Sequence, residues 1–457
     1  MAEVDVLLCP STKVAHSDPW RADKMDIAAA GMDWGAKDVQ KSAGNFDADY
    51  EALCRLFEVP AHPCLGSRRP KEATEGALDA KLEKPTSASK PSTIQLRNYT
   101  VDLTTLHLMM KALKTSSDVD TVIFHNAGLT EASVAVLVGG LQLTSVRSLG
   151  LDYNLPSSPS LVRPSASERR LKAAMRAAEA RGNTMENEVA STTPSSRPDF
   201  AGLVREGSKL KALSLRGNGL GDADAVDLAE AIEENTVLCS LNLFDNKITD
   251  VGATTLAKTL RLNTVLRGLS LSRNSLTSAS AEAFGLLLAG GYEISAVEQE
   301  KRALVEAKIV AQNKIAQDAM KKKKDARVET RLPLSTVVVQ TAGDGINRAV
   351  AGGSRSLATL NLGENRELGA GGALLGLLAR IVEARKEEVD KAASGAAGVV
   401  GSGAGAVVLQ ELHLARCQEY AEQEVGGGEH AAAAAGGDQA GMFAAMSLAL
   451  RPTKVVL

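Results

Sequence analysis

Apolar positions along this chain recur with a period of about 28 residues, most clearly in its centre. Residues 234–243 read ENTVLCSLNL and residues 262–271 read LNTVLRGLSL, an offset of 28 residues. Both segments follow the pattern L-x-x-L-x-L-x-x-N-x-L, whose alternating leucines predict a short strand with one buried face. A period of this length predicts an array of stacked strand-and-helix units.

Three consecutive units meet the whole pattern, and weaker copies continue it in both directions. The weaker copies begin at Pro91, Val119, Val146, Leu357 and Leu409, and residues 454–457 are predicted to open a ninth strand. The three complete units contain Leu210, Leu213, Leu215, Asn218 and Leu220, then Leu238, Leu241, Leu243, Asn246 and Ile248, then Leu266, Leu269, Leu271, Asn274 and Leu276.

The asparagine of the pattern follows the last strand leucine by three positions, where its amide can satisfy buried backbone groups. Stacked repeats are therefore predicted to form a ladder of such side chains. Cys417 takes this position in the eighth unit, whereas Tyr99 and Ala127 stand there in the first two, as in irregular units that end an array. The predicted ladder consists of Asn154, Asn218, Asn246, Asn274 and Asn365.

A helix is predicted after each strand. Residues 222–234 are an example, with Asp222 as the N-cap and with Val226, Ala229 and Ile232 on one face. The next helix begins at Asp250 and is predicted to repeat this arrangement through Val251, Ala253, Leu256, Ala257 and Leu260.

A 28-residue period with a full helix in each repeat resembles the ribonuclease-inhibitor-like class of leucine-rich-repeat proteins. The resemblance covers residues 91–417, apart from the insertions described below. It implies an α/β solenoid in the shape of a horseshoe, with a parallel β-sheet on the concave face, α-helices on the convex face and long insertions between repeats. It specifies no single function.

Three insertions interrupt the array, and they exceed one period by 36, 63 and 24 residues. The predicted organisation is an irregular N-terminal leader at 1–85 with one helix at 47–58 and a linker, first repeat units at 86–155, an insertion with a helix at 156–205, central units at 206–289, an insertion with a long charged helix at 290–353, and C-terminal units interrupted by Gly/Ala-rich loops at 354–457.

The sequences of the leader and of the first and third insertions predict simple local structures. The leader helix places Tyr50, Leu53, Cys54 and Phe57 on one face, so we expect it to cap the first repeat or to bind a partner. In the first insertion, residues 167–181 predict a helix between segments rich in Pro and Ser. Residues 392–405 and 426–437 are almost entirely small residues and predict flexible low-complexity loops.

The second insertion is the most distinctive, since residues 293–331 contain neither Gly nor Pro and predict a long exposed helix. Its apolar residues approach the heptad spacing of a coiled coil, but Lys301 and Lys308 fall in the same seam. The seam consists of Ile294, Val297, Leu304, Ala311 and Ile315.

This helix is predicted to end in the run Lys321, Lys322, Lys323 and Lys324. The lysines can contact an acidic partner, such as a tubulin tail or nucleic acid. Alternatively, they form a solvated helix end, which the helix dipole favours.

Charge and cysteine content narrow the expected environment. The net charge of −3, from 52 basic and 55 acidic residues, gives no global attraction to anions, so we expect neither a membrane nor nucleic acid as a partner. The five cysteines are odd in number and widely spaced, which predicts a reduced intracellular compartment. The start at residues 1–14 is acidic and no apolar stretch of about 18 residues occurs, so we expect a protein that is neither secreted nor membrane-spanning.

The sequence lacks the motifs of phosphate-binding loops, serine hydrolases and zinc proteases, so we expect no catalysis, cofactor or metal. His125 and His413 fall on the predicted concave face, where solvent-facing filler is the simplest interpretation. The glycines of residues 401–405 lie in low-complexity sequence. The GTPase-activating proteins for Ran share this repeat class, but this chain ends RPTKVVL instead of in the acidic tail that would support that activity.

Candidate partner-binding residues come from the predicted concave face and the lysine run. Most residues on that face are small or weakly polar, whereas binding hot spots favour Trp, Tyr and Arg. The candidates are Arg97, His125, Tyr153, Arg216, Phe244, Lys321, Lys322, Lys323 and Lys324.

In overall organisation, the broken array resembles the leucine-rich-repeat proteins of ciliary and flagellar axonemes. The resemblance implies a non-enzymatic protein-binding scaffold, namely a structural adaptor in a microtubule-associated complex of the axoneme whose partners are other subunits of a large cytoskeletal assembly. The alternatives are a cytoplasmic signalling or innate-immune adaptor and a Ran-type GTPase-activating protein.

Overall fold

The computed structural model covers most of the repeat array, and its chain divides into two compact units. Unit 1 comprises residues 1–157, 196–203 and 207–214, and unit 2 comprises the remaining residues. The residues that the structure describes are 43–65, 92–155, 198–205, 207–322, 331–335, 337–341, 347–369, 372–393, 409–414, 417 and 454–456. The helix predicted at 167–181, residues 394–405 and the loop at 426–437 lie outside them.

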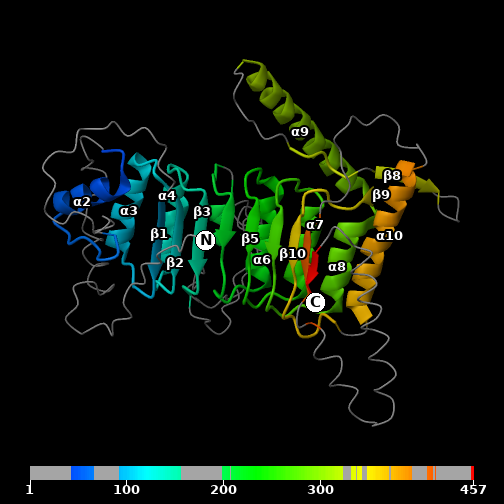
Figure 1. Ribbon diagram of the computed structural model, residues 1–457, viewed down its shortest axis with the longest axis horizontal. Coiled ribbons are helices and arrows are strands. Elements are labelled where there is room, and N and C mark those ends of the chain that lie inside the picture. The colour runs from blue at the N-terminus through cyan, green and yellow to red at the C-terminus, as the bar shows by residue number, and fades with distance from the viewer. Residues whose placement is uncertain are drawn as a thin grey trace, which may run out of the picture. The chain divides into compact units, whose positions relative to one another are not determined.

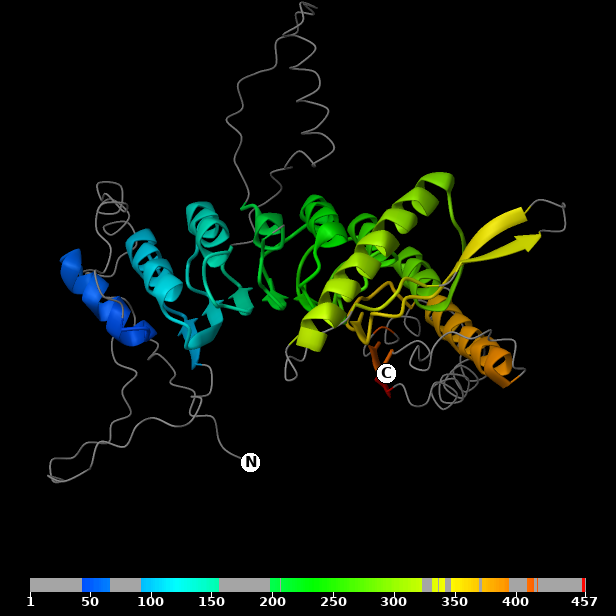
Figure 2. The same ribbon diagram turned by 90° about the horizontal axis from the view of Figure 1, so that it is seen from above.

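In unit 1, short parallel strands alternate with helices that cover one face of the resulting sheet (Figures 1 and 2). The strands pair side by side in chain order. The elements are α2 (Phe46–Leu56), β1 (Ser92–Arg97), α3 (Leu103–Thr115), β2 (Val119–His125), α4 (Glu131–Leu141), β3 (Ser148–Asp152), the 3-10 helix η1 (Phe200–Leu203) and β4 (Ala212–Ser214).

The register of these strands follows the repeat seen in the sequence. Ile94 pairs with Val122, Val122 with Leu149, and Leu149 with Leu213. All four side chains are buried, and burying such a side chain contributes about 1.5–3 kcal/mol. Because β3 pairs with β4, the first insertion leaves the strand register unchanged.

The leader helix α2 packs against α3 of the first repeat. Asn45 is its N-cap, and the helix buries Phe46, Tyr50, Leu53 and Cys54. Two hydrogen bonds join it to the repeat: the Thr115 hydroxyl donates to Asp49 at 2.9 Å, and the Phe46 amide donates to Asp118 at 3.1 Å. The expectation that this helix caps the first repeat is confirmed.

Unit 2 continues the alternation of strand and helix and adds a separate small sheet. The repeat elements are α6 (Asp222–Glu234), β5 (Ser240–Asn242), α7 (Asp250–Leu260), β6 (Gly268–Ser270), α8 (Ser278–Ala289), β10 (Thr359–Asn361), α10 (Ala373–Ala393), β11 (Glu411–His413) and β12 (Lys454–Val456). The second insertion forms β7 (Gly290–Glu293), α9 (Ala296–Lys322), β8 (Val337–Thr341) and β9 (Asn347–Gly352).

The strand register of unit 2 also survives its insertions. Leu269 of β6 pairs with Leu360 of β10, which pairs with Leu412 of β11, and these pairings span the second and third insertions. The strand predicted at residues 454–457 is present as β12, which lies parallel to β11. The predicted leucine-rich-repeat α/β solenoid is therefore confirmed.

The small sheet was not predicted from the sequence. It is antiparallel, in the order β7-β9-β8, and its buried cluster contains Tyr292, Ile294 and Ala351. The valines at 337–339 are its sequence signal, because β-branched residues favour strands. The long helix predicted within 293–331 is present as α9, and it extends beyond the repeat helices of unit 2 (Figure 1).

Asparagine side chains bind the backbone where each strand ends. The Asn246 amide donates to the carbonyls of Leu215 at 3.0 Å and Leu243 at 2.9 Å. Its oxygen accepts from the amides of Asn218 and Leu220, each at 3.1 Å. One buried side chain thus satisfies backbone groups of two successive repeats.

The same contacts recur along the array. Asn154 donates to Phe124 O at 3.0 Å and accepts from Ala127 N at 2.8 Å in unit 1. In unit 2, Asn365 donates to Leu271 O at 3.1 Å. Cys417 donates to Leu362 O at 3.4 Å, and burial raises the pKa of its thiol to about 11, so the thiol stays protonated and can donate.

A second set of asparagines, at the other end of the strands, was missed in the sequence. Asn263 donates to Ile232 O at 2.8 Å and accepts from the amides of Val265 and Leu266 at 2.8 Å. Asn235 makes the equivalent contacts one repeat earlier, donating to Val204 O at 2.6 Å. The shared letters NTVL of the two best-matched repeats are the signal that could have revealed it.

Asp222 does not act as the N-cap of its own helix, as the sequence suggested. Gly221 is the N-cap of α6, and Asp222 is the first helical residue. The Asp222 carboxylate instead accepts from the amides of Thr249 at 2.8 Å and Gly252 at 3.0 Å, at the start of α7. The start of α7 is therefore capped by the preceding repeat, because stacking brings the two helix N-termini side by side.

Asp250 caps the next helix in the same way. Its carboxylate accepts from the amide and hydroxyl of Thr277, at 2.9 and 2.5 Å, and from the amide and hydroxyl of Ser280.

Val251, predicted to pack in the core, is instead 64% exposed, because the side of α7 that carries it faces away from the sheet.

The reduced compartment predicted from the cysteine content implies that the cysteines are thiols. Cys64 is disulfide-bonded, so that expectation is wrong at this position. Cys54, Cys239 and Cys417 are thiols. Within the described part of the chain, no helix is long and apolar enough to cross a membrane.

Replacing Asn246 by Ala leaves buried carbonyl and amide groups of two repeats without partners. We expect the free energy of unfolding to fall by about 3 kcal/mol, since each such group costs about 1–3 kcal/mol. Urea denaturation measures it. The control is Lys247→Ala, at the next, exposed position, with an expected change within about 0.5 kcal/mol. Equal losses in both variants would contradict the ladder's role.

Asp250→Asn tests capping across repeats. Burial raises the pKa of Asp250, but the hydrogen bonds from Ser280 and Thr277 outweigh this and lower it below 3.8. The folded pKa is thus below the unfolded one, so the carboxylate stabilises the fold above about pH 4, and this contribution is lost as the pH falls further.

We expect Asp250→Asn to cost about 1 kcal/mol at pH 7. The difference from the natural chain should stay constant from about pH 5 to 8 and shrink below about pH 4. Thermal denaturation across this range checks it, with Glu306→Gln, at an exposed position on α9, as the control. A difference that grows on acidification would show that the sign is wrong.

Candidate functional site

The sheet face opposite the helices, here called the open face, carries the candidate residues of each unit. Side chains alternate along a strand, so residues next to buried core positions project from this face. In unit 1, Arg97 of β1 pairs with His125 of β2, and His125 pairs with Asp152 of β3. Three side chains of different charge thus form one row across consecutive repeats.

The row in unit 1 is held by specific contacts. Asp152 accepts a hydrogen bond from the Ser214 hydroxyl at 2.6 Å. The rings of His125 and Tyr153 meet edge to face, with their centroids 5.3 Å apart. The Nε atom of Arg97 is buried and has no hydrogen-bond partner among the described residues.

In unit 2, Arg216 and Phe244 form a pair on the open face. The Arg216 guanidinium lies 4.5 Å from the centroid of the Phe244 ring, a cation–π distance. The backbone positions them, since the Gly217 amide donates to the Phe244 carbonyl at 3.0 Å and continues the pairing of adjacent repeats. Arginine and aromatic side chains are the types that dominate binding hot spots.

The remaining open face of unit 2 is built from small or weakly polar residues. Asn242 and Asn361 accept hydrogen bonds from Phe244 N and Gly363 N, at 3.0 and 3.1 Å, and so are bound to their own strands. His413 lies 3.4 Å from the Glu411 carboxylate at the far end of this sheet. The larger Arg216–Phe244 pair is therefore the strongest candidate anchor in this unit.

The structure brings together candidate residues that occupy equivalent positions in consecutive repeats. Arg97, His125 and Tyr153 come together in unit 1, and Arg216 and Phe244 come together in unit 2. Asp152 lies in the same row as Arg97 and His125 but is not among the candidates from the sequence.

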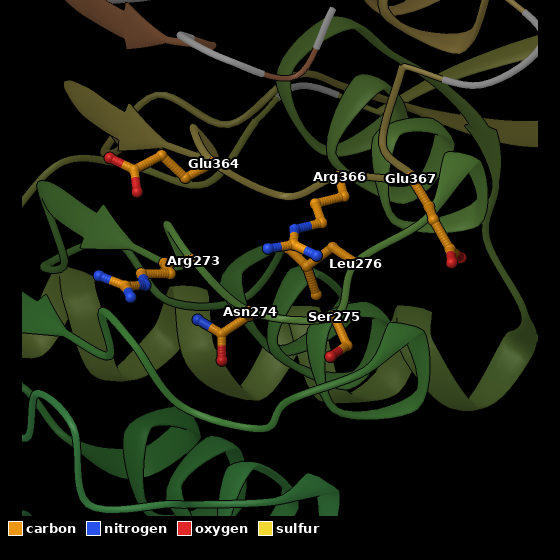
Figure 3. Close-up of a pocket in the computed structure, with 7 residues that line it drawn as sticks. All are labelled: Arg273, Asn274, Ser275, Leu276, Glu364, Arg366 and Glu367. Atoms are coloured by element: carbon orange, nitrogen blue, oxygen red, sulfur yellow. The ribbon is translucent and has the colours of Figure 1, made fainter. Parts of the chain in front are cut away.

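A shallow pocket of about 300 Å³ lies beside β6 and β10 in unit 2 (Figure 3). Its charges balance, since Arg273 and Arg366 face it together with Glu364 and Glu367. Arg273 already pairs with Asp245 at 3.1 Å. The pocket therefore has no excess charge to select an ionic ligand. Among the described residues, no cluster of His, Cys, Asp and Glu could hold a metal ion.

The inserted helix α9 is fixed to unit 2 by a buried arginine. Arg302 is only 3% exposed, and it donates to the carbonyl and hydroxyl of Ser335 at 2.8 and 2.7 Å and to the Tyr292 hydroxyl at 3.3 Å. Burial raises the pKa of Tyr292, so its hydroxyl stays protonated. The guanidinium of Arg261, at the end of α7, lies 3.7 Å from the Tyr292 ring centroid.

Further contacts place α9 near the C-terminal ends of the repeat helices. Lys301 forms an ion pair with Glu233 of α6 at 2.8 Å. The lysine run begins at the end of α9, and Lys321 and Lys322 are the last two residues of this helix. Lys323 and Lys324 lie outside the described residues. The side facing unit 2 holds Arg302, Ile309 and Ala316, not the apolar seam noted in the sequence.

Comparison with known proteins supports the repeat assignment. A family model described as Leucine Rich repeat matches residues 208–229 and 234–257. The matched residues contain β4, β5 and most of α6 and α7. No curated protein matches the chain. The chain therefore contains leucine-rich repeats, a type of repeat that is typically a non-enzymatic interaction module, and this suggests a protein–protein interaction scaffold.

A double-mutant cycle tests the Arg216–Phe244 pair. Arg216→Ala, Phe244→Ala and the double variant should show a coupling energy of about 0.5–1 kcal/mol in the free energy of unfolding, as expected of a partly exposed cation–π pair. Urea denaturation measures it. Arg273, which is bound to Asp245, supplies the control cycle with Phe244, where we expect no coupling. Equal coupling in both cycles would argue against a specific pair.

Proposed function

We propose that this protein is a structural adaptor of a ciliary or flagellar axonemal complex, built on repeats of the ribonuclease-inhibitor-like class. Other subunits of the assembly bind the open faces of its repeats. The helix α9 provides a second contact, whose lysine-rich end suits an acidic partner such as a tubulin tail.

The Arg216–Phe244 pair is the observation that carries the proposed binding mode. An arginine held against an aromatic ring has lost part of its rotamer freedom before binding, so less entropy is lost when a partner covers it. The small residues around it let a protruding partner segment approach the sheet. A rigid anchor that is surrounded by small side chains suits a long-lived contact in a large assembly.

The anchoring of α9 supports an architectural role. Removing one partner of a buried hydrogen-bonded charge is costly, because it leaves the other groups without partners. Arg302 therefore holds α9 at a fixed position on unit 2. A helix held in this way can set the spacing between two partners, which a flexible arm cannot do.

Fractionation of ciliated cells that express the tagged chain tests this proposal. We expect the chain in demembranated axonemes and expect Phe244→Ala to lower that retention about tenfold, the effect of losing a modest hot spot. Val251→Ala is the control, because Val251 is equally apolar and 64% exposed but lies on the helical side of unit 2.

Absence of the natural chain from axonemes would overturn the axonemal role, and recovery in cytosolic signalling complexes would favour the alternative adaptor role. Deleting residues 293–331 separates the two proposed contacts. Retention unchanged by this deletion, but lost with Phe244→Ala, would assign binding to the open face alone.

A further inference from the structure

Helix α9 has apolar residues on two opposite sides, and only one of these sides is buried. Arg302, Ile309 and Ala316 are spaced by seven residues and form the buried side. Residues two positions apart on a helix point about 200° apart. Leu304 therefore lies opposite Arg302, on the side that faces away from unit 2.

The outward side carries an apolar stripe, and Lys301 and Lys308 lie along the same seam. Val297, Leu304 and Ile315 are 66%, 65% and 69% exposed, and the exposed Ala311 lies between the last two. Single exposed apolar residues are ordinary. A row of them along a helix of 27 residues, about 40 Å long, is typical of a surface that packs against another helix.

We propose that two copies of this protein associate through α9, with the two helices packed antiparallel along this stripe. The charges beside the stripe argue for a second copy. Glu300 and Lys314 lie on the same flank, and each is seven residues from Ala307. In an antiparallel pair centred on Ala307, Glu300 of each copy lies opposite Lys314 of the other.

Side-chain size fits the same register. Ala307 meets its own equivalent at the centre, where a small side chain lets the two helices approach closely. Leu304 then lies within one residue of Ala311 of the second copy. Ile315 lies within two residues of Val297 of the second copy, so each end of the interface has an apolar contact.

An unrelated acidic partner fits this stripe less well. Glu300 precedes Lys314 on this flank, and the reverse order is found on the same helix running in the opposite direction. The association does not depend on the axonemal role, since it uses only the outward side of α9.

Sedimentation velocity of the full chain over a range of concentrations tests the proposal. We expect a reversible dimer. Leu304→Asp should abolish it, whereas Val310→Asp should leave it unchanged, because Val310 is 67% exposed on the same helix but lies about 120° away from the stripe. Both sites are exposed, so both variants should fold.

Charge exchange distinguishes a second copy from any other partner. Glu300→Lys or Lys314→Glu alone should weaken the dimer about tenfold, because two symmetric attractive pairs become repulsive. The double variant restores both pairs and should dimerise as the natural chain does.

Cross-linking tests the register. Ala307→Cys should form a disulfide-linked dimer under mild oxidation, whereas Val310→Cys should not, because only Ala307 meets its equivalent. A chain that is monomeric at all concentrations, a double variant as weak as the single ones, or equal cross-linking at both positions would overturn the proposal.

Discussion

The structure depends on hydrogen bonds to the buried backbone groups at the point where each strand ends and the chain turns toward its helix. There the peptide groups are buried but have left the ladder of the parallel sheet, and an unpaired buried group costs about 1–3 kcal/mol. Asn246 satisfies groups of its own repeat and of the preceding one. Each repeat thus needs its neighbour to complete its hydrogen bonds as well as its hydrophobic core, and the same logic extends to Asp222, which caps the next repeat's helix.

Because these contacts link only adjacent repeats, the array tolerates long insertions. The strands β6 and β10 pair directly although α9 and the small sheet lie between them in sequence. In a stacked array, stability comes from each repeat and its interfaces with neighbours, so an excursion that returns to the same edge disturbs neither. The second insertion then adds its own polar anchor through Arg302, which fixes a helix that the repeats do not require.

The same stacking makes the candidate binding surfaces. A period of 28 residues places equivalent side chains of consecutive repeats side by side, so His125 reaches Tyr153 and Arg216 reaches Phe244. Neither pair is adjacent in sequence, and each residue alone is a weak candidate. The pairing is what makes them candidate anchors, because each side chain contacts and orients the other.

The sequence by itself determined the repeat, the positions of the repeat strands and the helix at 222–234, because these follow from local periodicity that the units share. It did not show the small sheet of β7, β9 and β8, which lies outside that periodicity. The sequence also showed the positions of the asparagines, but it did not show which backbone groups their side chains bind. Only the tertiary structure decided that Asp222 caps the following helix, that Val251 faces away from the core, and that α9 packs through Arg302 and not through its apolar seam. The physical reason is that burial and pairing depend on which segments cover a side chain, and periodicity within one segment does not contain that information.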